Sequence, residues 1–375
     1  MTSSQLREHY APWIQLRLTD GLTTSRFAEL IGIYESPAAI LGVGVERLCA
    51  EAGLARPLAE AISRGIEAER IEQEFEAIER LSARLVCIND SEYPLNLKHS
   101  ASPPPLLYYL GDLQEVDRFA LAIVGTRRFS QYGRLACERL CGRLSEAGLT
   151  IVSGMARGID SIAHQTALRY DGRTLAVLGN GLNHCYPAEN QGLLEAIAAN
   201  GAIISEYPMA TEPERYHFPE RNRIIAGLSL GIVVVEAPAK SGALITADHA
   251  LEDNREVYAV PGDVTRVASE GANRLIQRGA KLVLDGDDII NDLRFLLADL
   301  LQEGNKKAHV ETLEGLDELQ RRIYELIAPE PLHIDVLLQS FSPDELSISR
   351  LSGLLFQLEM KNLVKQLPGQ IYAIP

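Results

Sequence analysis

The sequence is poor in cysteine, in basic residues and in long apolar runs. Five cysteines, an odd number without paired spacing, favour a reducing cytosol over a disulfide framework. Asp and Glu outnumber Lys and Arg by 51 to 36, and a formal charge of −15 argues against a protein that coats nucleic acid with its whole surface. Any nucleic-acid site must therefore be local. No apolar run approaches the ~18 residues that span a bilayer, and no signal-peptide core is visible, so we expect a soluble, cytoplasmic protein.

An apolar fraction of 46% over 375 residues is enough for full cores in two or three domains. The first part of the chain contains no convincing strand. Short amphipathic helices separated by Gly and Pro are expected at 13–18, 24–31 and 58–62, and a longer acidic helix at 67–85. We therefore predict a helical domain over 1–82.

The middle of the chain alternates between strands and helices. Three strands are expected to lead into it, at 84–90, 92–97 and 106–110. Unbroken Val/Ile/Leu runs separated by helical segments indicate a parallel sheet that is covered on both faces. The six runs lie at 121–124, 149–153, 175–178, 202–205, 231–235 and 257–260. We predict a doubly wound, Rossmann-like α/β domain over 83–300.

After a polar stretch that is typical of a linker, the last segment has the outline of a winged helix over 308–375. Helices are expected at 316–328, 333–338 and 347–361, followed by a Gly-turned hairpin at 363–374. This segment holds ten Asp or Glu but five Lys or Arg. A negatively charged wing is poorly suited to duplex grooves, so we expect it to contact protein or to modulate the core.

Ligands of open α/β sheets bind outside the carboxyl ends of the strands. At those ends the sequence alternates small residues with cations, namely Arg127, Arg128, Arg157, Arg221, Arg223 and Lys240. The turn at Ser241 and Gly242 precedes a predicted helix, where free backbone N–H groups and the helix dipole favour a phosphate. Each cation alone is typical of a solvated surface, but several at one sheet edge indicate a site for a phosphate-bearing ligand.

Several kinds of enzyme are disfavoured. Neither G-x-G-x-x-G nor G-x-x-x-x-G-K-[ST] is present, so we expect neither a dinucleotide enzyme nor a P-loop ATPase, and no cofactor. Two pairs of residues with i, i+4 spacing each allow two interpretations. Cys137 and Cys141 are either metal ligands or buried core thiols, and we prefer core thiols because no second His/Cys pair accompanies them. Asp160 and His164 form either an acid/base dyad or, as we prefer, a helix-start arrangement.

The same segments resemble the DNA-processing protein A family, also called DprA or Smf. The resemblance is carried in fixed order by GTR at 125–127, YG at 132–133, SGMARGID at 153–160, AH at 163–164, YPAEN at 186–190, SEYP at 205–208, FPERNRII at 218–225, VEA at 235–237, SGALIT at 241–246 and AVPG at 259–262. It covers 90–290 closely. Family members often carry a SAM-like helical domain before this core and a winged helix after it.

The resemblance implies a non-enzymatic protein of natural transformation. Such proteins bind incoming single-stranded DNA, protect it and help load the recombinase RecA, usually as homodimers through the Rossmann-like domain. The phosphate-binding turn of the family falls on Gly125, Thr126 and Arg127. Its basic pocket includes Lys240 beside the Ser241–Gly242 turn, with Arg157, Arg221 and Arg223 as further contributors.

The rival interpretation is an enzyme on the same fold, a nucleotide phosphoribohydrolase of the LOG type. Glu206 and Glu236 end two predicted strands, where a general base of such an enzyme would lie. The G-G-G-x-G and P-G-G-x-G-T patterns of that group are absent here. We therefore expect a DNA-binding protein without catalytic residues.

Overall fold

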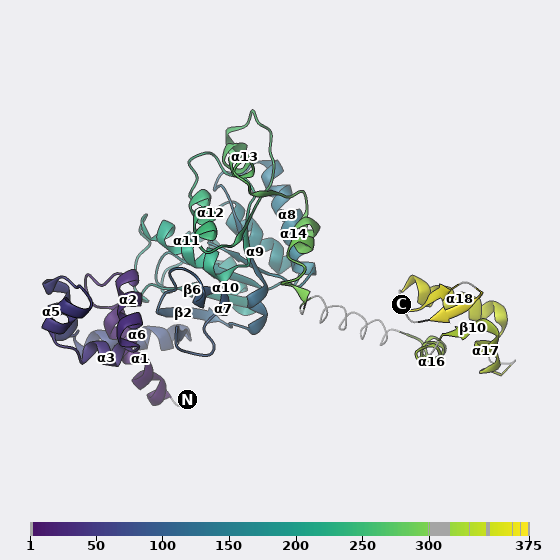
Figure 1. Ribbon diagram of the computed structural model, residues 1–375, viewed down its shortest axis with the longest axis horizontal. Helices are drawn as coiled ribbons and strands as arrows, with labels where there is room; N and C mark the ends of the chain where they lie inside the picture. The colour runs from purple at the N-terminus through teal and green to yellow at the C-terminus, as the bar shows by residue number, and fades with distance from the viewer. Residues whose placement is uncertain are drawn as a thin grey trace. The chain divides into compact units, whose positions relative to one another are not determined.

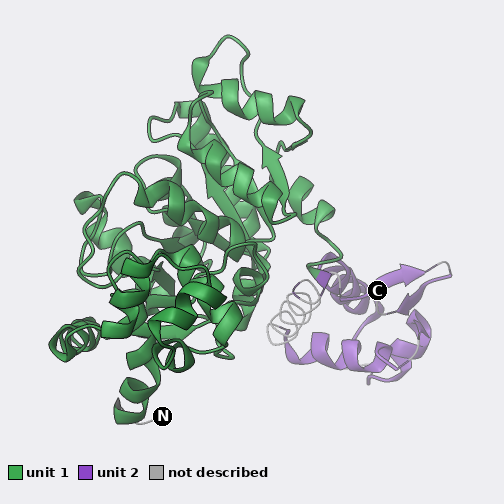
Figure 2. Ribbon diagram, turned by 60° about the vertical axis from the view of Figure 1, so that its left-hand side comes forward, with its two compact units in different colours: residues 1–297 green, residues 298–375 purple. Residues whose placement is uncertain are grey.

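A computed structural model shows two compact units, Met1–Leu297 and Ala298–Pro375 (Figure 2). Each unit is described by itself. The described residues are 3–298, 300, 316–329, 331–342, 346–361, 363–367 and 369–373.

Among the described residues of the first unit, nine strands form one sheet in the order β1-β2-β6-β5-β4-β3-β7-β8-β9. All strands from β6 to β9 in this order, including β5, β4 and β3, run parallel to one another. Beyond β6 the sheet continues with β2, which is antiparallel to β6, and β1, which is antiparallel to β2. The bounds are β1 Arg84–Cys87, β2 Leu106–Gly111, β3 Ala120–Val124, β4 Thr150–Ser153, β5 Thr174–Val177, β6 Gly201–Ser205, β7 Gly231–Val234, β8 Glu256–Ala259 and β9 Lys281–Leu282. The predicted doubly wound α/β fold and its six parallel strands are confirmed.

Helices cover both faces of this sheet, which is why β3 to β7 are buried along their whole length (Figure 1). One face packs against α7 Leu95–Lys98, α11 His217–Leu228, α12 Gly242–Glu252 and α13 Glu270–Gln277. The other group of helices comprises α8 Gln131–Glu146, α9 Ile159–Arg169, α10 Gln191–Asn200 and α14 Gly286–Asp292. The short 3-10 helices are η1 Glu115–Phe119, η2 Ala188–Asn190 and η3 Val267–Ser269.

The helices that precede the sheet share a core built around Trp13 and Phe27. They are α1 Ser3–Arg17, α2 Thr24–Tyr34, α3 Pro37–Leu41, α4 Val45–Glu51, α5 Arg56–Arg64 and α6 Ala68–Leu81. The same core continues through Leu106 and Tyr108 of β2 into the sheet. These helices therefore lie within the first unit, at the sheet end that carries β1 and β2.

Two predicted elements are wrong in detail. The acidic helix was expected to reach residue 85, but it ends at Leu81 because Ser82 takes a left-handed conformation with φ 54°. The segment 92–97 was expected to be a strand. It contains a turn and then α7, which begins directly after Pro94, a residue whose ring restrains φ to a helix-compatible value.

The second unit has the predicted winged-helix architecture. Its helices are α16 Glu318–Ile327, α17 Ile334–Gln339 and α18 Ile348–Met360, and its wing pairs β11 Lys365–Leu367 with β12 Ile371–Ala373. A strand that the sequence did not predict, β10 Leu332–His333, pairs with β12. None of the helices in the described ranges is both long and apolar enough to cross a membrane.

Candidate nucleic-acid interface

The strand order reverses between β3 and β7. From β3 the chain continues into α8, and from β7 it continues into α12, which belongs to the opposite group of helices. Two loops that leave a parallel sheet toward opposite faces open a crevice at the carboxyl ends of their strands. The loop after β3 starts with Gly125, and the loop after β7 ends with Ser241, so two predicted phosphate-binding turns meet here.

A cavity of about 640 Å³ lies at this reversal. Seven of the nine predicted site residues line it, namely Gly125, Thr126, Arg127, Arg221, Lys240, Ser241 and Gly242. Other residues of its wall include Ala156, Asp160, Tyr186, Arg215, Phe218, Asn222 and Thr246. The structure therefore brings together residues that span more than 100 positions of the sequence.

Backbone contacts fix the loop that follows β3. The Thr126 N–H donates to the carbonyl of Glu236 at 2.7 Å, and the Thr126 carbonyl accepts from the Ile159 N–H at 3.3 Å. The Glu236 carboxylate accepts two bonds from Ser130, at 2.8 Å from the backbone N–H and 2.8 Å from the hydroxyl. The loop after β3 is thereby tied to the loops after β4 and β7.

Three exposed cations at the cavity have no salt bridge to any described residue: Arg127, Arg215 and Lys240. The Arg127 guanidinium lies 5.6 Å from the centroid of the Phe218 ring, a cation–π distance that leaves its N–H groups available. Arg215 was not predicted, because it lies in the irregular segment before α11, outside the recognised motifs. Unpaired cations in an acidic protein supply the local positive charge that a phosphate backbone requires.

The start of α12 adds hydrogen-bond donors to these charges. Ser241 is the N-cap residue, and its hydroxyl accepts from the Ala243 N–H at 3.3 Å. Ser241, Gly242 and Ala243 all line the cavity. The free N–H groups and the dipole of an 11-residue helix therefore meet the same space as Lys240, an arrangement that favours an anion.

Arg221 lies under the cavity rather than in its opening. It is 3% exposed and donates to the carbonyl oxygens of Gly154, at 2.7 Å, and Val177. Burial lowers its pKa to about 10, so it stays charged at neutral pH. Burial likewise raises the pKa of the neighbouring Asp160 to about 6, although the Arg221 charge opposes that shift. Arg221 thus holds the loops after β4 and β5 and adds charge from below.

The two other predicted arginines have carboxylate partners. Arg157 is exposed and forms an ion pair with Glu189. It lines a narrow cleft beside the cavity, together with Arg127 and Phe218. Arg223 pairs with the buried Glu206 and also donates to the Ser102 carbonyl.

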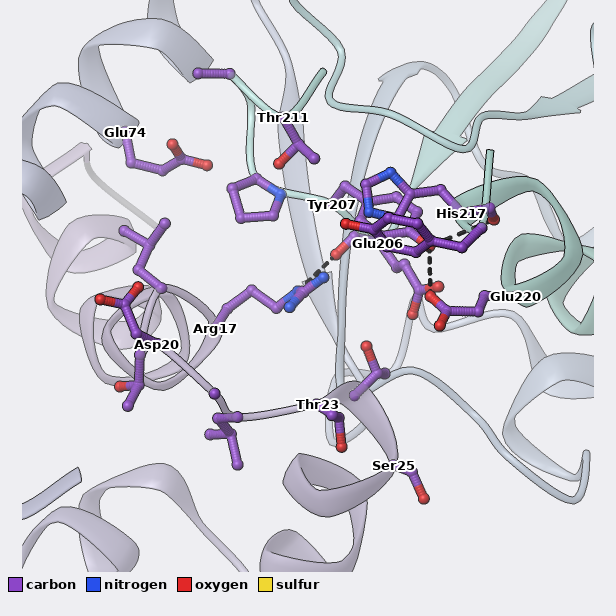
Figure 3. Close-up of a pocket in the computed structure, with 18 of the residues that line it drawn as sticks. Arg17, Asp20, Thr23, Ser25, Glu74, Glu206, Tyr207, Thr211, His217 and Glu220 are labelled. Carbon is purple, nitrogen blue, oxygen red and sulfur yellow. Dashed lines mark hydrogen bonds between the residues drawn. The ribbon is translucent and has the colours of Figure 1, made fainter. Parts of the chain in front are cut away.

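Arg223 belongs to a second, larger cavity of about 1230 Å³ between the N-terminal helices and the sheet domain. Figure 3 shows Arg17 directed toward Glu206, whose backbone carbonyl accepts from it at 2.8 Å. The Tyr207 hydroxyl donates to Glu220 at 3.2 Å in the same wall (Figure 3). Five carboxylates and four arginines line this cavity, whereas four cations and a single carboxylate, Asp160, line the cavity at the β3–β7 reversal.

Glu206 and Glu236, the two carboxylates on which the enzyme interpretation rested, are bound by other side chains. Glu206 holds Arg223 and Glu236 holds Ser130, so neither faces a substrate space as a free base. Asp160 accepts from the Ala156 N–H at 3.3 Å, whereas His164 Nδ1 lies 2.6 Å from the Thr174 hydroxyl. These two side chains therefore serve different neighbours instead of forming a dyad.

The cysteine pair Cys137 and Cys141 is buried in α8, with the two sulfur atoms 3.8 Å apart. In the described part of the chain, neither thiol belongs to a group of three potential metal ligands. The structure supports the interpretation as core thiols.

A doubly wound sheet with unpaired cations in a cavity at its reversal point defines a Rossmann-like protein, and the chemistry of this cavity suits a phosphate-bearing ligand. A sequence model described as DNA recombination-mediator protein A matches residues 84–294, and one described as DprA winged helix domain matches 307–370. The chain belongs to the DNA recombination-mediator protein A family. The predicted resemblance is confirmed, and the family is one of DNA-processing recombination mediators rather than enzymes.

Similar proteins include Protein Smf of Synechocystis sp., which is 39% identical over 316 residues, 76% of this chain and 78% of that protein. DNA processing protein DprA of Streptococcus pneumoniae is 43% identical over 208 residues, 56% of this chain and 73% of that protein. A crystal structure of the S. pneumoniae protein superposes with a TM-score of 0.67 at 34% identity, covering 75% of this chain and 97% of that chain.

A structure of DNA processing protein A from Helicobacter pylori, described for its single-stranded DNA binding mode, is also similar. Its TM-score is 0.52 at 30% identity, and the match covers 57% of this chain and 96% of that chain.

Proposed function

We propose that this protein binds the sugar-phosphate backbone of single-stranded DNA, without sequence preference, in the cavity at the β3–β7 reversal. The observation that carries the proposal is the convergence there of Arg127, Arg215 and Lys240, none of them paired with a carboxylate among the described residues. The H. pylori relative, which is described as binding single-stranded DNA, supports the same ligand.

The chemistry of the cavity favours a chain of phosphates over a closed nucleotide site. Guanidinium groups bind phosphate oxygens in bidentate fashion, and successive phosphates can meet successive cations. Phe218 and Tyr186 lie in the wall with ring centroids 5.4 Å apart, and aromatic faces accept any base by stacking. Sequence-tolerant binding follows from these two kinds of contact.

The predicted site residues divide into three roles. Arg127 and Lys240 bind phosphate through their charges, while Gly125, Ser241 and Gly242 bring backbone N–H groups close to it. Thr126, whose N–H donates to the Glu236 carbonyl, fixes the turn. Arg221 is a positioning residue, because its guanidinium is engaged by two backbone carbonyls. Arg157 and Arg223 contribute little to phosphate binding, since each is already paired with a carboxylate.

A mobility-shift comparison of single- and double-stranded oligonucleotides over a salt series tests the proposal. We expect preference for the single strand, similar affinity for oligo-dT and mixed sequences, and an affinity that falls steeply with salt. Equal binding of duplex, or binding that does not respond to salt, would contradict it. An oligo-dT complex with the strand on another surface would do the same.

We further propose that the bound strand is incoming DNA of natural transformation, which the protein protects and passes to RecA in the cytoplasm. Homodimerisation through the Rossmann-like domain completes this proposal, and the acidic winged helix contacts protein or modulates the core. Family membership supports the mediator role. The test measures RecA filament formation on strands covered by single-strand-binding protein; acceleration by the wild type but not by Arg127→Ala is expected, and no acceleration contradicts RecA loading.

A further inference from the structure

Three potential metal ligands meet where α1 approaches the end of β1. His9 comes from α1, Cys87 is the last residue of β1, and Asp90 follows in the next turn. Their ligand atoms all lie within 4.8 Å of one another. Within the part of the chain that the structure describes, this is the one group of three His, Cys, Asp or Glu side chains that meets this criterion.

Two of the three distances between ligand atoms lie within about half an ångström of those in a tetrahedral metal site. His9 Nε2 lies 3.1 Å from Asp90 Oδ1 and 3.9 Å from Cys87 Sγ. In a tetrahedral zinc site, with Zn–N and Zn–O near ~2.1 Å and Zn–S near ~2.3 Å, ligand atoms lie roughly 3.3 to 3.6 Å apart. The exposed His9 ring lies slightly too close to Asp90 and slightly too far from Cys87 for this geometry, and the third pair, Cys87 and Asp90, lies within 4.8 Å. Binding the ion therefore requires small movements of the three side chains.

Neighbouring groups already orient the carboxylate. Asp90 Oδ2 accepts from the Cys87 N–H at 2.7 Å and from the Tyr10 hydroxyl at 2.7 Å, which leaves Oδ1 directed at His9. The Asp90 N–H in turn donates to the Cys87 carbonyl at 2.9 Å and closes the turn. Hydrogen bonds of this kind hold ligands in place in metal sites, and a two-residue spacer between ligands is typical of zinc-binding turns.

We propose that His9, Cys87 and Asp90 bind a Zn²⁺ ion with one coordination position left for water. Nitrogen, sulfur and oxygen donors together suit zinc, whereas the thiol disfavours Mg²⁺ and Ca²⁺. On binding, the Cys87 thiol loses its proton to solvent and the sulfur forms the bond to zinc, so one proton is released for each ion. The ion joins α1 to β1 and thereby fastens the N-terminal helices to the sheet.

The test uses the full-length protein after chelation and dialysis, with Co²⁺ as the probe. Cobalt bound to a thiolate shows a sulfur-to-metal charge-transfer absorption, so the titration reports Cys87 directly. We expect one Co²⁺ per chain, released by an equivalent of Zn²⁺. Cys87→Ser should abolish the absorption, and His9→Gln should weaken Co²⁺ binding at least about tenfold.

Cys185→Ser and Cys49→Ser are controls for the loss of a thiol, because neither cysteine belongs to the cluster. Both should retain the absorption, and His9→Gln, at an exposed position, should keep the folded far-ultraviolet spectrum. No charge-transfer absorption in the wild type, or one that survives Cys87→Ser, would overturn the proposal. The readout does not involve DNA, so the result of this test does not depend on whether the proposed function is correct.

Discussion

Gly158 lies directly against the carbonyl oxygen of Thr126. A Cβ atom built on Gly158 would be 2.4 Å from that oxygen and 2.7 Å from the Arg127 Cα, and Gly158 has φ +90°. The next residue, Ile159, donates its N–H to the same carbonyl at 3.3 Å. The loop after β4 therefore supports the turn that presents Arg127, and this contact requires a residue without a side chain.

Gly158→Ala tests that support. The added methyl group must displace backbone, and the left-handed conformation strains any other residue, so we expect a loss of about 1–3 kcal/mol in the free energy of unfolding. Affinity for single-stranded DNA should fall as well, because the Thr126–Arg127 turn moves. Urea denaturation and mobility shift measure the two effects.

Gly192→Ala is the matched control for this substitution. Gly192 lies in the first turn of α10 with open space around its Cβ position and no positive φ. Alanine there should leave DNA binding unchanged and stabilise the protein by up to about 1 kcal/mol. If Gly158→Ala behaves like Gly192→Ala, the proposed support of the turn is wrong.

Arg127→Ala should weaken binding of single-stranded DNA about tenfold and reduce the salt slope by roughly 0.7, the contribution of one phosphate contact on a single strand. The reason is that Arg127 forms no ion pair with a described carboxylate, so its guanidinium can bind phosphate without breaking one. Arg157→Ala is the control, since Arg157 is paired with Glu189 and should affect binding less. Equal losses, or an unchanged salt slope for Arg127→Ala, would place the strand elsewhere.

The six central strands were predictable because each contains an apolar run that is buried, along the whole strand in β3 to β7 and after Glu256 in β8, and such a run can be recognised without knowledge of the fold. β9 and β10 were missed for the opposite reason. Each has two residues, and the residues of β9 are exposed, so neither carries a periodic signal. α7 was misassigned because its four residues follow a proline in a segment as apolar as a short strand.

The site was partly predictable, because carboxyl ends of parallel strands meet at one edge. Which cations stay free depends on partners that are far apart in the sequence, as for Arg223 and Glu206 or Arg157 and Glu189. Arg215 carries no motif, and only the fold places it at the cavity. Pairing and burial of charges are properties of the tertiary structure.

Arg221→Leu should destabilise the protein by about 3–5 kcal/mol, because it removes a donor from two backbone carbonyls and the stronger of two counter-charges from the buried Asp160. Arg157→Leu, at an exposed ion pair, should leave the urea midpoint unchanged. If Arg221→Leu unfolds at the wild-type urea concentration yet loses DNA binding, Arg221 contacts the ligand directly instead of positioning the loops.

The buried His164 makes stability depend on pH. Burial lowers its pKa from 6.5 to about 3, and its Nε2 has no hydrogen-bond partner in the described structure. Between these two pKa values the unfolded chain binds one more proton than the folded protein, so the free energy of unfolding rises with pH, by about 1.4 kcal/mol per unit. Asp160 has a raised pKa of about 6 and contributes the opposite slope between 3.8 and 6.

His164→Gln separates the two contributions, since Asp160 is present in both proteins and its slope cancels in their difference. The stability of the wild type relative to the variant should increase by about 2 kcal/mol from pH 4.5 to 6.0 and stay constant above pH 7. Urea denaturation at pH 4.5, 5.25, 6.0 and 7.5 measures this difference. A difference that is independent of pH would mean that the pKa of His164 is the same in the folded and the unfolded protein, so that burial does not favour its neutral form.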